Sequence, residues 1–184
     1  GSAVAAEIPT LTAIRMAEGG VFDHLGGGFC RYSTDRTWTI PHFEKMLYDN
    51  GPLLALYSDA WRATGDELFA RVAEETAAWV MREMQSPAGG YYSSLDADSE
   101  HEEGKYYVWT PEAVRACLSG DEWAVVEPHY GLDRPPNFEQ RHWHLRVSKP
   151  LATVAQQTGQ SVERCRALLD GARAKLFARR ETRM

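Results

Sequence analysis

The stretch Asp23–Asn50 reads DHLGGGFCRYSTDRTWTIPHFEKMLYDN, and its pattern decides most of the expected fold. Three consecutive glycines cannot extend a stable helix, so we expect a loop or hairpin with unusual backbone angles there. The short alternations of residues 29–40 predict a small antiparallel strand pair. Pro41 then predicts a helix start, because proline is favoured in the first helical turn. The tripeptide NGP at 50–52 predicts either a kink in that helix or the start of a second one.

Apolar residues recur at helical spacing along most of the remaining chain. Gly65 is suited to end one helix and Asp66 to cap the next, which predicts a helical hairpin. Thr110 and Pro111 predict a further helix start, with a hydroxyl cap followed by a first-turn proline. The expected helices are 8–18, 53–63, 66–85, 112–118, 121–130 and 161–180.

A second glycine pair opens the stretch GGYYSSLDADSEHEEGKYYVW at 89–109, which is similar in kind to the first. Its two aromatic segments predict two short strands joined by an acidic loop. A further strand is expected at 142–147. The chain therefore repeats a pattern of helices and glycine-aromatic hairpins, and repeated helical hairpins commonly carry their extra loops on one face.

Composition excludes several classes of protein. The 184 residues include 43% hydrophobic and 25% charged residues, which suits one globular domain or a piece of a larger one. No apolar run is long enough to span a membrane, and the start does not resemble a signal peptide. The net charge of −6 disfavours nucleic acid as a partner. Three distant cysteines without a CxxC fit a reducing compartment, so we expect a cytoplasmic protein.

The acidic loop is the first candidate site. Asp96, Asp98 and Glu100 alternate, so in an extended segment their carboxylates would point the same way. Such a group could chelate calcium or magnesium, although the spacing does not match an EF-hand. It could instead supply a general acid and base, or form only a solvated, turn-capping loop.

The polar residues after the first glycine run are the second candidate. His42 could act as a general base beside Glu44 and Asp49. The neighbouring aromatic residues could stack on sugar rings whose hydroxyl groups bond to the charged side chains. The alternative is that the aromatic residues are core and that the charges, including Lys45 with Asp49, pair locally.

Several weaker signals in the sequence also have structural explanations. Cys30 could be a reactive thiol, but a half-buried structural cysteine is the commoner case. The glycine run lacks the lysine of a phosphate-binding P-loop. His142 and His144 share strand spacing without an evident third ligand. We therefore predict no metal and no cofactor.

Taken together, the segments DHLGGGFCRYSTDRTWTIPHFEKMLYDN and GGYYSSLDADSEHEEGKYYVWTPEAV resemble the signature segments of the YyaL-type, spermatogenesis-associated protein 20-like family of thioredoxin-domain-containing proteins. The resemblance implies a thioredoxin-like domain, absent from this chain, followed by an (α/α)6 toroid of the six-hairpin glycosidase-like class. Residues 7–184 would be the N-terminal half of that toroid, about three hairpins, and residues 1–6 a cloning scar or linker. Cys30 stands where the family motif usually has His.

The fold class expected is therefore mainly α: a partial (α/α)6 toroid with short β-hairpins in its loops. Fold analogy implies a carbohydrate-active domain, with a sugar or polyol as ligand. The alternative is a non-enzymatic scaffold that binds clients and partners the thioredoxin-like domain. A half toroid is also expected to self-associate through exposed apolar edges. The residues expected to line the cleft are Asp96, Asp98, His42, Glu44 and Asp49 for catalysis, and His24, Arg31, Asp35, Trp38 and Trp109 for substrate binding.

Overall fold

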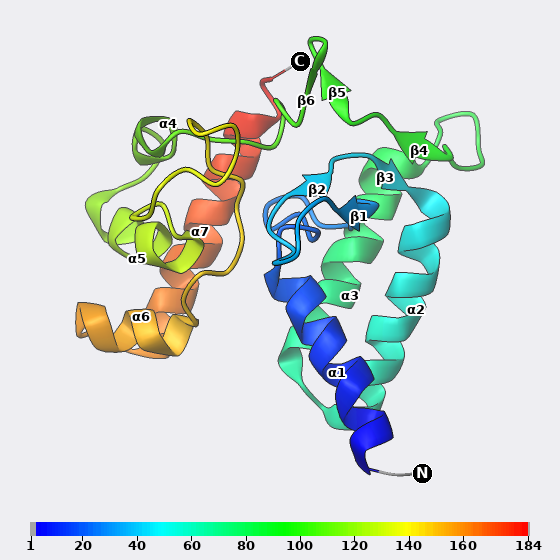
Figure 1. The fold of residues 1–184 in the computed structure, drawn as a ribbon, viewed down its shortest axis with the longest axis horizontal. Coiled ribbons are helices and arrows are strands. Elements are labelled where there is room, and N and C mark those ends of the chain that lie inside the picture. The colour runs from blue at the N-terminus through cyan, green and yellow to red at the C-terminus, as the bar shows by residue number, and fades with distance from the viewer. Residues whose placement is uncertain (1–2, 184) are drawn as a thin grey trace. The chain divides into compact units, whose positions relative to one another are not determined.

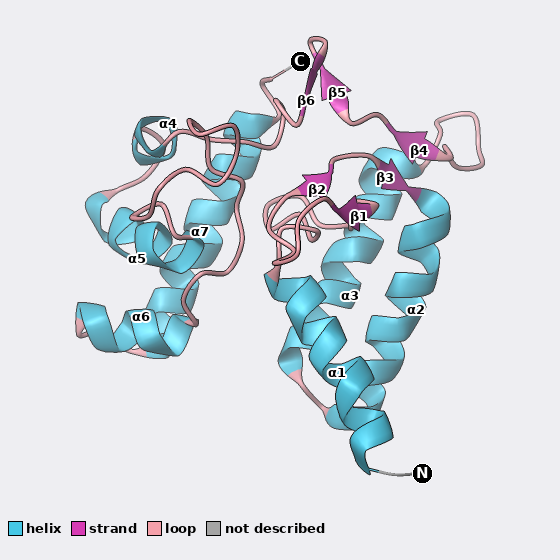
Figure 2. Cartoon of the chain, viewed as in Figure 1, coloured by secondary structure: helices cyan, strands magenta, loops and turns pink. Residues whose placement is uncertain are grey.

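The computed structural model describes residues 3–183, with side chains from residue 7 onward, as a mainly α protein (Figure 1). The chain divides into two compact units, the first ending at Asp98 and the second beginning at Ser99. Strands are confined to short antiparallel pairs, as Figure 2 shows. The predicted fold class, mainly α with small β-hairpins, is confirmed at this level, while the assignment to half of a toroid stays a prediction.

Three helices form the body of the first unit. Helices α2 and α3 pack along each other, and α1 contacts α3 (Figure 1). Tyr57 from α2 lies in the core and donates its hydroxyl hydrogen to the Ala13 carbonyl of α1 at 2.7 Å. Burial raises the pKa of Tyr57. The elements of this unit are α1 (Ala3–Glu18), β1 (Tyr32–Ser33), β2 (Pro41–His42), β3 (Lys45–Met46), α2 (Leu47–Thr64), α3 (Glu67–Trp79), the π-helical segment η1 (Val80–Met84) and β4 (Ser94–Leu95).

The helix boundaries of the α2–α3 hairpin follow from capping. Gly65 adopts a left-handed conformation at φ 72° after α2, and the Asp66 side chain accepts a hydrogen bond from the Leu68 N–H to cap α3. Both predictions are confirmed. Helix α1 begins earlier than expected, at Ala3, so it reaches into the segment 1–6 that we predicted to be a scar or linker.

The prediction of a helix start at Pro41 is wrong. Pro41 and His42 form strand β2, which pairs with β1, and α2 begins only at Leu47. The intervening β3 pairs with β4, so the backbone groups that a helix would need are committed to strand partners. Proline is compatible with such a two-residue strand, because it lacks only its own backbone N–H and so removes at most one strand hydrogen bond. Helix α2 continues through Pro52, so no second helix starts there.

The predicted hairpin between the two aromatic segments of 89–109 is also wrong. Strand β4 pairs with β3, far earlier in the chain, rather than with the segment after the acidic loop. Strand β5 (Asp98–Ser99) pairs with β6 (Glu102–Glu103), which makes the acidic loop itself a tight hairpin. The polar residues of the acidic loop thus form two short strands, because the backbone reverses direction between β5 and β6. The hydrophobic pattern of the sequence did not indicate these strands.

The second unit is built on α7. Helix α5 packs on α7, and α6, which the sequence did not predict, contacts both. Ser119 and Glu122 form a reciprocal capping box at the start of α5. Single bridges, Trp109 with Trp143 and Phe138 with His142, replace the strand expected at 142–147. The helices are α4 (Pro111–Arg115), α5 (Gly120–Tyr130), α6 (Leu151–Thr158) and α7 (Val162–Arg180).

Within residues 3–183, every helix is too short or too polar to cross a lipid bilayer.

Candidate functional site

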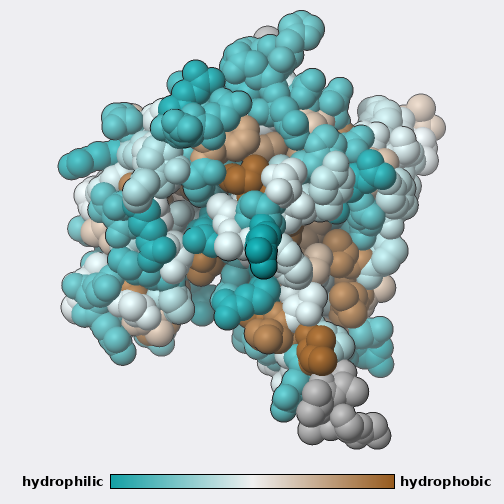
Figure 3. Space-filling view, viewed as in Figure 1, coloured by the Kyte–Doolittle hydropathy of each residue, from teal (hydrophilic) through white to brown (hydrophobic). Residues whose placement is uncertain are grey.

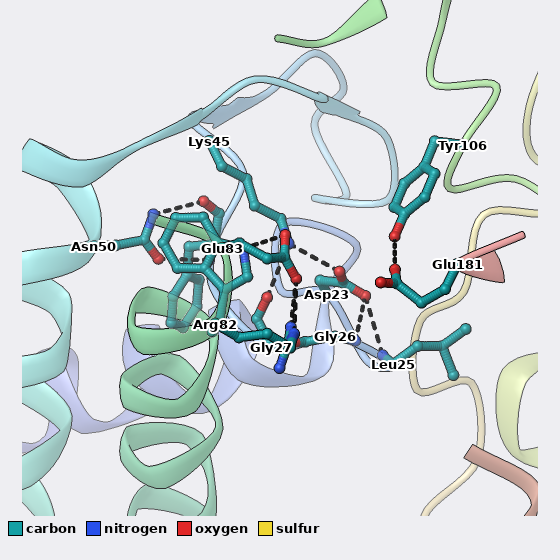
Figure 4. Close-up of polar contacts among 12 residues, drawn as sticks. Asp23, Leu25, Gly26, Gly27, Lys45, Asn50, Arg82, Glu83, Tyr106 and Glu181 are labelled. Carbon is teal, nitrogen blue, oxygen red and sulfur yellow. Dashed lines mark hydrogen bonds and ion pairs between the residues drawn. The ribbon is translucent and has the colours of Figure 1, made fainter. Parts of the chain in front are cut away.

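A buried ion pair anchors the glycine loop of the first unit (Figure 4). Lys45 lies 2.8 Å from the Asp23 carboxylate, and the two side chains are only 1% and 3% exposed. The Lys45 ammonium also donates to the Gly27 carbonyl at 2.8 Å and lies 5.2 Å from the centre of the Trp79 ring. The second Asp23 oxygen accepts from the backbone N–H groups of Leu25 and Gly26. Lys45 therefore pairs with Asp23, and the predicted local pair with Asp49 is wrong.

The glycines are required because the loop lies directly against helix α3. Gly27 and Gly28 have φ values of 78° and 77°. A Cβ atom on Gly27 would lie 2.3 Å from the Glu75 carbonyl oxygen, and one on Gly28 would lie 2.6 Å from the Trp79 ring. Side chains of any kind are excluded at such distances, so the two glycines serve close packing of the loop on α3.

Further side chains hold the same loop from two directions. Arg82, in η1, donates to the Gly26 carbonyl at 2.7 Å and bonds to Glu83, whose other oxygen accepts from the Trp79 indole. The Asn50 side chain accepts from the Phe29 N–H at 2.7 Å and donates to the Phe29 carbonyl at 2.9 Å. Figure 4 shows these contacts converging on the loop. The π-helical segment η1 thus places Arg82 against the loop carbonyl of Gly26, and it places Glu83 where it bonds to both Arg82 and Trp79.

A pocket of about 510 Å³ lies beside this braced loop, entirely within the first unit. Four predicted site residues line it. Its floor is apolar, and its walls carry aromatic and charged side chains. The lining residues are Met16, Val21, Cys30, Arg31, Tyr32, Ser33, Asp35, Trp38, Tyr48, Asp49, Pro52 and Leu53.

Asp49 is the lining residue with the least satisfied polar group. It lies in the first turn of α2, and its Oδ2 atom is buried without a hydrogen-bond partner among the described residues. Burial raises the pKa of Asp49, the Glu44 carboxylate raises it further, and Arg31 opposes the shift. A carboxyl group whose pKa is raised in this way holds its proton to higher pH than an exposed aspartate does, which suits it to donate or accept a proton.

Arg31 links the pocket to the neighbouring predicted residues. Its guanidinium lies 3.2 Å from Glu44 and 5.9 Å from the centre of the Tyr48 ring. The Tyr48 hydroxyl group, then Glu44 and Asp49, raise the pKa of Arg31. His42 lies 3.6 Å from the same Glu44 oxygen and stacks on Tyr32, but neither His42 nor Glu44 lines the pocket. These two residues therefore hold Arg31 and Tyr32 in position.

Asp35 is committed to its own loop. Its two oxygens accept hydrogen bonds from the N–H groups of Thr37, Thr39 and Ile40 and from the Thr37 hydroxyl. Burial alone would raise the pKa of Asp35, but these hydrogen bonds outweigh it and lower the pKa. Asp35 thus shapes the wall of the pocket. Trp38 completes that wall with a left-handed backbone at φ 56°.

The remaining predicted residues lie elsewhere. His24 is buried, and its Nε2 atom is 2.9 Å from the Gly19 carbonyl oxygen. Asp96 and Asp98 are exposed, and an Asp96 oxygen accepts from the Asp98 N–H in a local turn. Trp109 belongs to the second unit and lines a pocket made by that unit alone. Each of the two pockets is lined by residues of one unit, and a single cleft that joins all the predicted residues stays a prediction.

The acidic loop is the segment where the sequence allows a calcium or magnesium site. Among the side chains described from residue 7 to 183, no three His, Cys, Asp or Glu residues come together as metal ligands would. Lys105 instead pairs with Glu100 at 2.7 Å and with Glu102 at 3.0 Å across the β5–β6 hairpin. The solvated alternative described the loop better than chelation did.

The sequence reasoning missed the bracing residues Asp23, Lys45 and Asn50 and the pocket aromatics Tyr32 and Tyr48. Lysine and aspartate separated by 22 positions carry no local pattern. One signal was available: aromatic residues flank the polar run, and the sequence left open whether they stack on a sugar or belong to the core. Both tyrosines are more than half exposed, at 53% and 55%.

Comparison with known proteins identifies the family. No protein-family model matches the chain. It is 42% identical over 192 residues to spermatogenesis-associated protein 20 of Mus musculus and 40% identical to the same protein of Homo sapiens, covering 91% of this chain in each case. The chain belongs to the spermatogenesis-associated protein 20 family. It is also 40% identical over 116 residues to uncharacterized protein B0495.5 of Caenorhabditis elegans, covering 58% of the chain and 16% of that protein.

The family predicted from the two glycine-aromatic motifs is thereby confirmed. The chain spans 24% of the length of the mouse and human spermatogenesis-associated proteins 20. The activity of a full-length member of the family therefore remains a proposal.

Proposed function

We propose that the Asp49 pocket binds a small hydroxyl-rich molecule, a sugar or polyol, and that Asp49 exchanges a proton with it. The observation that carries this proposal is the buried Oδ2 atom of Asp49, which lacks a hydrogen-bond partner in the described residues although it lies in a pocket wall. A hydroxyl group of a ligand would supply the missing donor. Leaving a buried carboxylate oxygen unsatisfied costs stability, so such a donor is favoured.

The rest of the pocket suits the same ligand. Its volume of about 510 Å³ lies within the ordinary range for small-molecule sites, roughly 300–1,000 Å³. Tyr32, Tyr48 and Trp38 offer aromatic faces for the C–H faces of a sugar ring. Arg31 and Ser33 add polar groups at the edge, while Asp35 has no spare lone pair directed away from its loop donors. The combination of aromatic walls with few charged groups favours a neutral ligand.

Proton transfer fits the site better than glycoside hydrolysis. Most glycoside hydrolases use two carboxyl groups, one acting as acid and the other as base or nucleophile. Only Asp49 is available in this pocket, because the Asp35 oxygens are occupied by backbone N–H groups. One available carboxyl group therefore fits proton exchange better than it fits glycoside hydrolysis. In the full-length protein, Asp49 would be one acid–base group of a reaction like that of a sugar epimerase or isomerase.

The experiment is titration calorimetry with a panel of sugars, sugar alcohols and sugar phosphates, using the full-length protein and this chain. Asp49→Asn is expected to weaken binding of the best ligand by about tenfold or more, since a charge-assisted hydrogen bond is lost. Asp59→Asn is the matched control, because Asp59 lies on the same helix but is 73% exposed and pairs only with Arg62. Absence of heat with every compound, or equal binding by both variants, would contradict the proposal.

A non-enzymatic scaffold is the second candidate, and one observation favours it. Several polar side chains of the first segment are used internally: Asp23, Lys45 and Asn50 all bond to the glycine loop or its ends. A rigid loop of this kind could present a surface to the thioredoxin-like domain that the family resemblance implies. Failure of all ligands in the calorimetric panel would support this second function.

Self-association stays a prediction. The first unit exposes apolar side chains on its helices, including Ile8 and Leu11 of α1 and Leu56 and Trp61 of α2. Figure 3 shows apolar residues at the surface around the lower part of α1 as drawn. Exposed apolar groups of this kind are common at protein interfaces, so a second copy or another part of the family protein is the expected occupant.

A further inference from the structure

A second pocket, of about 940 Å³, lies within the second unit. The β5–β6 hairpin, the loop around residues 138–142 and the residues just after α7 form its walls. Its lining combines aromatic side chains, Tyr106, Trp109 and Phe138, with charged groups of both signs. Only Trp109 was expected to take part in binding, so this pocket is independent of the Asp49 site.

Arg183 is the distinctive group in this pocket. One of its nitrogens, Nη1, donates to the carbonyl oxygens of Tyr106 and Val108, both at 2.8 Å. The guanidinium carbon lies 3.8 Å from the centre of the Trp109 ring, which is the distance of a stacked cation–π contact. These contacts fix the guanidinium while leaving Nε and Nη2 without a partner in the described chain.

The other cations of the pocket are paired with carboxylates, and Arg183 is not. Lys105 pairs with Glu100 and Glu102, and Arg141 lies 3.0 Å from Glu139. Among the described residues no carboxylate lies within ion-pair distance of Arg183. Burial, followed by the charges of Arg180 and Arg179, lowers the pKa of Arg183 to about 10. A half-buried cation that has two further arginines nearby and no carboxylate paired with it gains free energy from an added anion.

Two further polar atoms of lining residues lack partners. Trp109 is 2% exposed, and its indole Nε1–H has no acceptor in the described residues. The Nδ1 atom of His142 is likewise buried without a partner. Buried indole N–H groups usually find an acceptor, so an oxygen ligand would satisfy a need that the protein leaves open.

We propose that this pocket binds an organic monocarboxylate, with its carboxylate on the Arg183 guanidinium and its body against the aromatic walls. A planar guanidinium matches a carboxylate through two parallel hydrogen bonds. The rim carries Glu102, Glu103 and Glu139, whose negative charges disfavour a dianion such as a phosphate monoester. A single negative charge on an apolar or aromatic body therefore fits best.

The test compares three probes that share a phenyl ring and differ in head group and charge: benzoate, phenyl phosphate and benzamide. Titration is followed by the NMR signals of the Trp109 indole N–H and of the Arg183 Nε–H in the isotope-labelled chain. Benzoate is expected to shift both signals saturably, phenyl phosphate to bind more weakly, and benzamide to leave both unchanged. Benzoate binding without a shift at Arg183, or equal binding of benzamide, would overturn the proposal.

Substitution separates the role of Arg183 from general positive charge. Arg183→Gln is expected to weaken benzoate binding by about tenfold or more. Arg166→Gln is the matched control, since it removes the same charge from an exposed position on α7 that does not line the pocket. If Arg183→Gln loses its folded spectrum, the Arg183 Nε–H shift of the unsubstituted chain still decides the question. Equal loss in both variants contradicts the proposal.

Discussion

Two glycine-aromatic segments of similar composition have opposite structural roles. In the first, Gly27 and Gly28 are buried against α3, and an acid and a lysine meet in the core beneath them. In the second, Gly89 and Gly90 also adopt positive φ values, 90° and 77°, yet nothing lies within 4 Å of where their Cβ atoms would be. A left-handed backbone conformation alone therefore does not show whether a glycine is needed for close packing or only for a turn. The difference is whether a neighbouring helix packs against the glycine.

The charged residues of the two segments differ in the same way. The Asp23–Lys45 pair is almost fully buried, whereas Lys105 and its two glutamates are 40% to 58% exposed. Exposed pairs contribute about 0–1 kcal/mol, while loss of one partner of a buried pair costs about 3–5 kcal/mol. The first segment is thus the anchor of its unit, and the second is a surface hairpin.

The largest expected effect comes from adding one methyl group to each segment. Gly28→Ala places a Cβ atom 2.6 Å from the Trp79 ring at φ 77°, and should lower the free energy of unfolding by about 2–5 kcal/mol. Gly90→Ala has the same φ and open space, so a loss of only about 1 kcal/mol is expected. Urea unfolding followed by circular dichroism measures both, and equal losses would contradict the assigned difference.

A loss of comparable size is expected from breaking the buried ion pair of the first segment, and a much smaller one from breaking the exposed pair of the second. Asp23→Ala leaves the Lys45 ammonium buried without its carboxylate and should cost about 3–4 kcal/mol. Glu102→Ala removes one exposed partner of Lys105 and should cost less than about 1 kcal/mol.

The double variant Asp23→Ala with Lys45→Met sharpens this result. Removal of both buried charges should recover part of the lost stability, because no unpaired ion remains in the core. The free energies of unfolding of the single and double variants, measured in the same denaturant series, give the coupling. A double variant that is less stable than the unsubstituted chain by the sum of the two single losses would show that the two side chains act independently.

Much of the helical framework was predictable from the sequence, since it depends on local signals. Gly65, Asp66, Thr110 and Ser161 end or cap helices by contacts within a few residues, and their predicted positions are confirmed. The wrong helix start at Pro41 and the wrong partner of β4 share one cause, which is pairing between distant segments. Strand β3 pairs with β4 about fifty positions away, and this pairing delays the start of α2.

The candidate site was predictable only in part. Arg31, Asp35, Trp38 and Asp49 were chosen for their residue types and do line one pocket. Asp96 and Asp98 had equally suitable types but form an exposed local turn. Residue type gives the chemistry that is available, whereas burial next to a pocket depends on the tertiary packing of α1 and α2 against the loops.

The smallest effect concerns two carboxyl groups within the first segment. The pKa of Asp35 is lowered, so its contribution to stability is present above the unfolded-state value, about 3.9, and is lost as pH falls through the folded-state pKa. The pKa of Asp49 is raised, so its contribution is present below about pH 3.9 and is lost as pH rises through the folded-state pKa. Above the folded-state pKa of Asp49, the Asp49→Asn variant should therefore be more stable than the unsubstituted chain. Above about pH 3.9, the Asp35→Asn variant should be less stable than the unsubstituted chain.

The most direct test of the Asp49 pocket is an NMR titration of its side-chain carboxyl carbon, with Asp35 as the internal reference. The structure predicts that Asp49 titrates above the ordinary aspartate pKa of about 3.9 and Asp35 below it. Binding of a sugar or polyol from the calorimetric panel should shift the Asp49 signal and leave Asp35 nearly unchanged. An Asp49 pKa at or below that of Asp35 would contradict a buried, proton-exchanging carboxyl group and would favour the scaffold function.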